Sequence, residues 1–158
     1  GEYEAQNPVG DWTIWVLDTA TGWVLRGTGP YDLGIRHGVW TFYWDKEGTV
    51  ESELLYLNDL REGPWISYWP DGTPRIDGYF LSGVGEYFWQ YWYQNGRKMA
   101  EHTLHEGKRN GEETTWYEDG QLKSQGGYSD DKKVGVWVYW DEEGNETTEE
   151  FDAWGYPK

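Results

Sequence analysis

Residues 63–72 read GPWISYWPDG, and this stretch decides the fold because close copies of it recur along the chain. Its Trp, Ile and Tyr side chains favour a pleated, half-buried strand. The Pro-Asp-Gly that closes it supplies the positive backbone dihedrals of a tight hairpin turn. The stretch and the residues after it therefore predict one β-hairpin.

Related stretches begin at residues 10, 38, 63, 87, 111 and 135. The glycines that close their turns recur every 24 residues, at positions 48, 72, 96, 120 and 144, and Gly22 precedes the first of these by 26. A fixed period of this length indicates tandem units. We predict one repeat domain over residues 1–158, with units near 10–37, 38–62, 63–86, 87–110, 111–134 and 135–158. The expected fold class is all-β: an elongated array of six tandem hairpins that forms a single twisted sheet.

Two segments, residues 51–62 and 97–107, could pass for short helices because Glu, Leu, Lys, Met and Ala are good helix formers. The same slot of the repeat holds QLKSQGGY at residues 121–128, whose paired glycines suit a helix poorly. Because tandem units should share one structure, we interpret these segments as return strands. The polar stretches LNDLRE (57–62) and HEGKRN (105–110) are interpreted as linkers to the next unit.

Aromatic residues outnumber aliphatic ones, and side chains in a strand alternate between faces. Parity places the anchor tryptophans, which we expect to pack the units together, on one face: Trp40, Trp65, Trp89 and Trp137. The opposite set is the predicted partner-binding site: Tyr43, Tyr68, Trp92, Trp116 and Trp140. Including Trp140 requires a local bulge, because the last unit reads as one residue short between Trp137 and its turn. The alternative is that both sets are structural, with linkers folded over the second face.

The formal net charge is −16 at pH 7, which repels phosphate backbones and anionic lipid and attracts basic partners. Nucleic acid is therefore excluded as a partner and membrane surfaces are disfavoured. The chain contains no cysteine, so it offers no disulfide framework or thiolate metal site. It begins at Gly1 without a hydrophobic leader, which we interpret as a processed or trimmed product. Both the cytoplasm and export after removal of a leader fit this interpretation.

Catalytic chemistry is the least supported class. The three histidines are His37, His102 and His105, and parity puts the last two on opposite faces, so they do not make a ready metal pair. The acidic clusters fall at turns or linkers and follow no calcium-loop pattern. Paired catalytic carboxylates would need a concave pocket that an open sheet lacks. We expect no catalytic residue, no metal site and no cofactor.

The units resemble MORN repeats, and more narrowly the MORN-variant repeat of bacterial proteins classed as YwqK-type antitoxins. The resemblance rests on segments such as Gly38-Val39-Trp40-x-x-Tyr43 and Gly63-Pro64-Trp65-x-x-Tyr68, and on the Asp-Gly or Asn-Gly turns that follow. Departures are Tyr87 for the opening Gly of the fourth unit and Glu113 for the anchor Trp of the fifth. The resemblance implies a twisted sheet of hairpins, protein contacts without enzyme activity, and toxin neutralisation in bacterial members.

Three functions therefore follow as hypotheses. The first is a protein-binding scaffold of the antitoxin or immunity kind, whose partner is a protein such as a basic toxin. The second is a carbohydrate or cell-wall binding module, because rows of Trp and Tyr stack on sugar rings and hold choline-type cations. The third is an assembly segment whose edge strands pair between chains. The sequence does not determine the oligomeric state.

Overall fold

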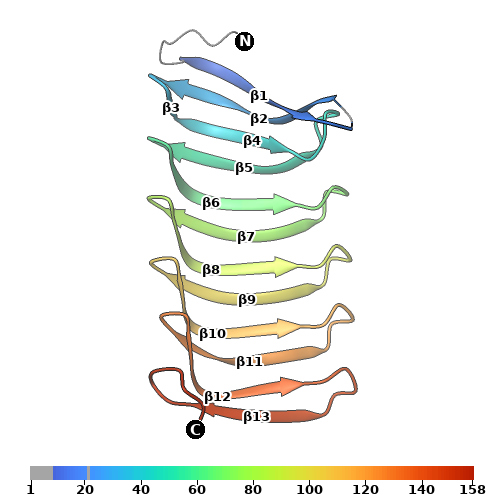
Figure 1. Ribbon diagram of the computed structural model, residues 1–158, viewed down its shortest axis with the longest axis vertical. Coiled ribbons are helices and arrows are strands. Elements are labelled where there is room, and N and C mark those ends of the chain that lie inside the picture. The colour runs from blue at the N-terminus through green and yellow to red at the C-terminus, as the bar shows by residue number, and fades with distance from the viewer. Residues whose placement is uncertain (1–8, 21) are drawn as a thin grey trace.

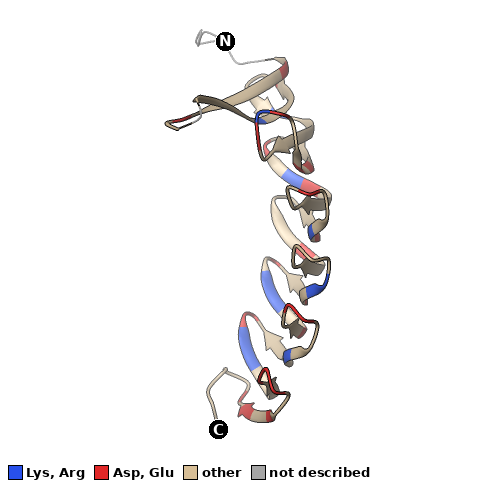
Figure 2. Ribbon diagram, turned by 90° about the vertical axis from the view of Figure 1, so that its right-hand side faces the viewer, with Lys and Arg blue, Asp and Glu red and all other residues tan. Residues whose placement is uncertain are grey.

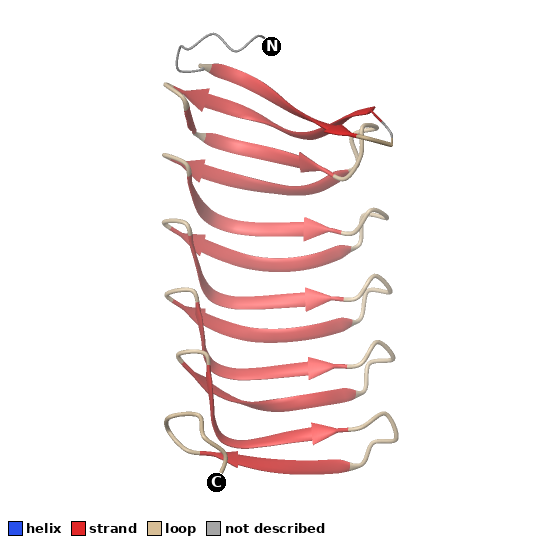
Figure 3. Ribbon diagram, viewed as in Figure 1, coloured by secondary structure: helices blue, strands red, loops and turns tan. Residues whose placement is uncertain are grey.

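The computed structural model describes residues 9–20 and 22–158, and these form thirteen strands in one antiparallel sheet (Figure 3). Residues 1–8 of the predicted domain and Thr21 of its first unit lie outside the described residues. The strands are β1 (Gly10–Asp18), β2 (Gly22–Asp32), β3 (Ile35–Arg36), β4 (Gly38–Tyr43), β5 (Val50–Leu57), β6 (Leu60–Tyr68), β7 (Pro74–Leu81), β8 (Val84–Trp92), β9 (Lys98–His105), β10 (Lys108–Trp116), β11 (Leu122–Ser129), β12 (Lys132–Trp140) and β13 (Glu146–Phe151).

The strands follow one another in the sheet in chain order, except that the short β3 pairs only with β2. β1 and β13 lie at opposite ends of the long axis, and the hairpins are stacked between them in a single layer (Figure 1). The predicted fold class is thereby confirmed, as an open hairpin array. The two helix-prone segments are the return strands β5 and β9, because in each the ladder to both neighbouring strands outweighs the local helix propensity.

The turns that join β6 to β7, β8 to β9 and their equivalents repeat one geometry. In the third unit the amide of Trp69 donates to the carbonyl of Thr73 at 2.8 Å, and the amide of Gly72 donates to the carbonyl of Trp69 at 2.8 Å. Asp71 accepts from both the amide and the hydroxyl of Thr73. Gly72 has a φ of 85°, so the Pro-Asp-Gly signal has the predicted physical basis.

The interpretation of residues 57–62 and 105–110 as linkers is wrong. Each contains a two-residue turn whose central residues both have positive φ: 53° and 64° at Asn58 and Asp59, and 52° and 78° at Glu106 and Gly107. This is the turn geometry that matches the right-handed twist of paired strands. The chain therefore runs as one continuous meander, and no linker is available there to cover a face of the sheet.

The bulge expected before Trp140 is also absent. All five earlier hairpins shift register by one residue, for example between Ser67 and Tyr68, where the return strand contributes the extra residue. The β12–β13 ladder runs without a shift from the Gly135–Phe151 pair to the Trp140–Glu146 pair. No bulge is needed, because Trp140 follows Trp137 by three residues, as Tyr68 follows Trp65.

The anchor tryptophans form the core of this thin sheet. Trp40, Trp89 and Trp137 are buried, with 0%, 5% and 1% of their surface exposed. Each indole covers a glycine of the preceding return strand, namely Gly29, Gly78 and Gly126, where a Cβ would lie closer than 3.0 Å to the ring. Trp65 is half-buried against Phe80 and Trp89, with centroids 5.7 and 5.8 Å away. The anchor tryptophans thus pack the units together, as predicted.

Candidate binding surface

The predicted partner-binding residues occupy one equivalent position in five successive units. Each ends its strand, β4, β6, β8, β10 or β12, three residues after the anchor position. All five are half-buried: Tyr43, Tyr68, Trp92, Trp116 and Trp140. Strand alternation puts them opposite the anchors, on a face that also carries Glu53, Asp77 and Glu101. We call it the carboxylate face.

A second set of rings, which sequence reasoning did not assign, ties these positions together. The residue after each predicted site donates a hydrogen bond from its ring to the backbone carbonyl of the site residue in the next unit. The bonds run from Trp44 to Tyr68 (2.9 Å), Trp69 to Trp92 (3.1 Å), Tyr93 to Trp116 (2.9 Å) and Tyr117 to Trp140 (2.9 Å). The recurring aromatic doublet was the signal that could have revealed this ladder. It fixes the spacing of the site residues from unit to unit.

The carboxylates form a row across the middle of their face. The register pairs Glu53 with Thr41 and Ile66, Asp77 with Ile66 and Gln90, and Glu101 with Gln90 and Thr114. Successive carboxylates are thus two strands apart, which is about 9.5 Å at the usual strand spacing. In each case the predicted ring of the next unit lies diagonally across from the carboxylate, within reach of a large side chain.

One of these ring and carboxylate pairs already holds a cation from the chain itself. The ammonium of Lys98 lies 2.6 Å from Glu101 Oε2 and 5.7 Å from the centroid of the Trp116 ring. Gln90 also contacts the same carboxylate oxygen, at 3.4 Å. At this one pair, the face therefore holds an ammonium group of the chain itself between a ring and a carboxylate.

The other four predicted positions differ in what surrounds them. Tyr43 has Thr28 in place of the carboxylate, and their hydroxyls bond at 3.1 Å. Trp140 has Gln125 at the same position. Tyr68 and Trp92 lie beside Glu53 and Asp77, which are both exposed. Glu53 accepts one long bond, 3.4 Å from Thr41. Tyr68 and Trp92 are therefore the two positions that combine a half-exposed ring with an accessible carboxylate.

Glu113 replaces the anchor tryptophan of the fifth unit and is the centre of a buried polar cluster. Its carboxylate lies 3.4 Å from Arg109 Nη1 and 3.4 Å from His102 Nδ1, which makes no regular hydrogen bond. Arg109 also bonds Tyr128 at 2.9 Å and Asp131 at 3.2 Å. Burial alone would raise the pKa of Glu113, but the contacts with His102 and Arg109 outweigh it, and the pKa lies below its ordinary value.

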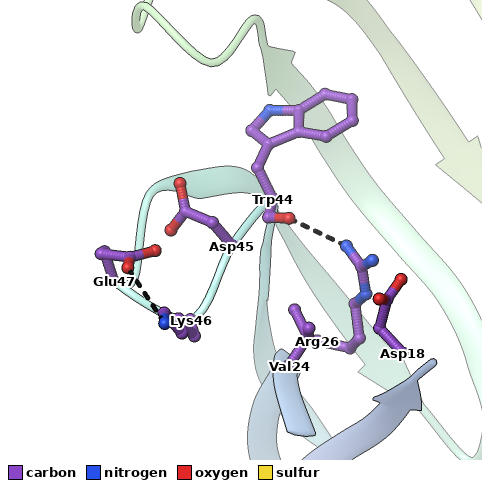
Figure 4. Close-up of a pocket in the computed structure, with 7 residues that line it drawn as sticks. All are labelled: Asp18, Val24, Arg26, Trp44, Asp45, Lys46 and Glu47. Carbon is purple, nitrogen blue, oxygen red and sulfur yellow. Dashed lines mark hydrogen bonds and ion pairs between the residues drawn. The ribbon is translucent and has the colours of Figure 1, made fainter. Parts of the chain in front are cut away.

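Two hollows lie beside the long turns that join the strands of each hairpin, along one side of the array. The first, about 240 Å³, is lined by Asp18, Val24, Arg26, Trp44, Asp45, Lys46 and Glu47 (Figure 4). Arg26 spans it and donates to the carbonyl of Trp44 at 2.9 Å. The second, about 460 Å³, is lined by Tyr93, Tyr117, Glu118, Asp119 and Glu142. Acidic segments recur at the turns along this side (Figure 2). Neither hollow includes a predicted site residue.

The described part of the chain has no group of three or more His, Asp or Glu side chains placed to hold a metal ion. Two histidines instead lie near carboxylates: His102 near Glu113, and His105 near Glu86 at 3.5 Å. Within residues 9–20 and 22–158, no helix is long and apolar enough to cross a membrane.

An open, single-layer array of hairpins with an aromatic, acidic face defines a repeat-based binding scaffold. The family model of the MORN repeat variant matches residues 61–81 and 109–130, which supports the predicted resemblance to MORN repeats. The matched segments cover β6–β7 and β10–β11, and the hairpins between and around them repeat the same geometry. MORN repeats are generally non-catalytic binding repeats. No curated protein matches the chain in sequence.

Proposed function

We propose that the chain is a non-enzymatic scaffold of the antitoxin or immunity kind, which captures a basic protein partner on the carboxylate face. The observation that carries this proposal is the ammonium of Lys98 held between Glu101 and the ring of Trp116. It is a model of how a basic side chain fits this surface. The five predicted residues, Tyr43, Tyr68, Trp92, Trp116 and Trp140, line the contact.

The charge of the chain supports the same proposal. A net charge of −16 raises the encounter rate with a basic protein and falls away with salt. If the partner is a toxin that acts on nucleic acid, the carboxylate face takes the place of the phosphate backbone in its active site. Neutralisation then needs no chemistry from this chain.

The test is to express the chain with the products of its neighbouring genes, purify the complex, and measure stoichiometry and association rate. We expect a stoichiometric complex with a basic protein and an association rate that falls steeply as the ionic strength rises. Loss of the partner's toxicity on co-expression would support the antitoxin role. A chain that forms no stoichiometric complex with any neighbouring product, or one whose binding is indifferent to salt, would contradict the proposal.

The alternative is a carbohydrate or choline-binding module of the cell wall, which the same row of half-exposed rings favours. Rings bind quaternary ammonium groups through their faces. A titration with choline and cell-wall glycans, followed by tryptophan fluorescence, separates the two functions. A saturable change that is lost in Trp92→Ala would favour the module, and an unchanged spectrum would leave protein binding as the function.

A further inference from the structure

Lys98 occupies a position whose equivalents carry no cation in the other units. It pairs with Trp92 in the β8–β9 ladder, and the corresponding pairs are Tyr43 with Val50, Tyr68 with Pro74 and Trp116 with Leu122. We use the word gap for the space between each carboxylate and the ring diagonally across from it. Among these units, only the gap between Glu101 and Trp116 receives a lysine, from the start of β9.

The two preceding units also place an aromatic ring and a carboxylate at the positions of Trp116 and Glu101. In one unit, the positions of Lys98, Glu101 and Trp116 are taken by Val50, Glu53 and Tyr68. In the next, they are taken by Pro74, Asp77 and Trp92. Glu53 and Asp77 are exposed, whereas Glu101 is partly covered. These two gaps are built like the filled one and lack its cation.

The nearest basic side chain on these strands is engaged elsewhere. Arg75, beside Pro74, lies 3.8 Å from Glu51. Its guanidinium is also 5.3 Å from the ring of Trp44 and 5.1 Å from the ring of Trp69. It thus stacks between rings of the hydrogen-bond ladder, next to the turns.

We propose that Glu53 with Tyr68, and Asp77 with Trp92, are two subsites that each bind one Lys or Arg side chain of the partner. The partner segment crosses the strands in a polyproline II conformation, with its two basic residues three positions apart and therefore on the same side. This inference rests on the proposed function and specifies the chemistry of the partner that the carboxylate face accepts.

The spacing of the subsites selects the conformation of the partner. They are one unit apart, or two strands, which is about 9.5 Å. Three residues of a polyproline II chain rise about 9.3 Å and complete one turn, whereas two or four residues give about 6.2 and 12.4 Å. In a β-strand, side chains three positions apart point to opposite faces, so a strand does not fill both subsites. A helix offers about 10.5 Å between residues seven positions apart, so a proline-rich probe, which cannot form a helix, separates the two conformations.

The first experiment compares two synthetic peptides of equal composition, made of Lys, Pro and Ser, by calorimetry at physiological salt. One has lysine at every third position and the other has its lysines adjacent. We expect the spaced peptide to bind about tenfold more tightly, since it alone fills both subsites. Equal affinities, or tighter binding of the adjacent-lysine peptide, would overturn the inference.

The second experiment empties or fills the subsites by mutation. The double variant Glu53→Gln with Asp77→Asn should weaken the spaced peptide about tenfold. The matched control, Glu143→Gln with Glu149→Gln, makes the same charge change at exposed sites outside the subsites and should cost less than about twofold. Equal losses in both double variants would show that only net charge matters.

The third experiment uses the lysine position itself. Pro74→Lys supplies an internal cation to the second subsite and should weaken the peptide, whereas Pro74→Ser should not. Lys98→Met should open a third subsite and tighten the binding of a peptide with three spaced lysines. Its charge-matched control is Lys108→Met, which changes an exposed lysine at the start of β10. Circular dichroism confirms that each variant folds. Opposite or absent effects would refute the subsite assignment.

These outcomes separate the inference from the function beneath it. If the chain forms its complex with a basic partner but neither peptide spacing nor Glu53 and Asp77 affect binding, the subsites are wrong and the scaffold stands. If no basic protein or peptide binds at all, the proposed function fails with them.

Discussion

Gly126→Ala should be among the most damaging small substitutions in the chain, and Gly127→Ala, its immediate neighbour, should be nearly neutral. A Cβ on Gly126 would lie closer than 3.0 Å to three carbons of the Trp137 indole. The ring has little room to yield, because it is 1% exposed and its Nε1 donates to the carbonyl of Gly127 at 3.0 Å. A Cβ on Gly127 would meet only Val134, at 3.4 and 3.5 Å.

Two responses of Trp137 bound the cost. If the ring stays and the strands shift, overpacking costs about 1–3 kcal/mol, and a broken ring hydrogen bond adds about 1 kcal/mol. If the ring swings into solvent, re-exposing about 150–250 Å² costs about 4–6 kcal/mol at 25 cal/mol per Å². The cheaper response prevails, so we expect Gly126→Ala to lose about 2–4 kcal/mol.

Urea unfolding followed by far-ultraviolet circular dichroism measures this loss, with Gly127→Ala as the control. The control should lose no more than about 0.5 kcal/mol, because Gly to Ala at an unstrained site restricts the unfolded chain and by itself stabilises the fold. In a hairpin array the damage should begin in the last units, which contact only their neighbours. Equal unfolding midpoints for the two variants would refute the account of ring-over-glycine packing.

Two further predictions concern polar contacts. The pKa of Glu113 is depressed in the folded chain. The charged carboxylate therefore contributes fully to the free energy of unfolding above the ordinary pKa of 4.5, and this contribution is lost as the pH falls through the lower pKa of the folded state. As the pH is lowered below 4.5, the thermal midpoint should fall, and it should fall less steeply in Glu113→Gln than in the parent chain. Parallel plots of midpoint against pH would contradict this. Trp69→Phe removes the bond to the carbonyl of Trp92 and should cost about 1 kcal/mol by urea unfolding. The exposed Trp15→Phe should cost less than about 0.5 kcal/mol, and equal losses would show that the ring ladder contributes nothing.

The hairpin array could be predicted from the sequence because its signals are local and repeated. Asp71-Gly72 and its equivalents mark each long turn, and strand parity sorts Trp65 from Tyr68 without any long-range information. The period of 24 then makes each unit a check on the next. Local signals that agree across units are what allowed the helix propensity of β5 and β9 to be rejected.

The missed features depend on distances between units, which alternation along one strand does not contain. The bond from Trp69 to Trp92 needs the twist of the sheet to bring a ring to a carbonyl two strands away. The position of Lys98 beside Trp116 depends on the bulge in its return strand. The predicted bulge at Trp140 was wrong because the spacing from Trp137 to Trp140 equals that from Trp65 to Tyr68. Asn58-Asp59 was a turn signal in the sequence that was interpreted as a linker.

The uninterrupted meander has an evolutionary consequence. Removing one residue from a strand would reverse every later side chain of that strand between the two faces, so short insertions and deletions are penalised throughout the array. Gaining or losing a whole repeat keeps the alternation intact, and it would lengthen or shorten the carboxylate face by one of the proposed binding positions. Duplication of complete units is therefore the path by which such a protein would follow a partner that grows longer.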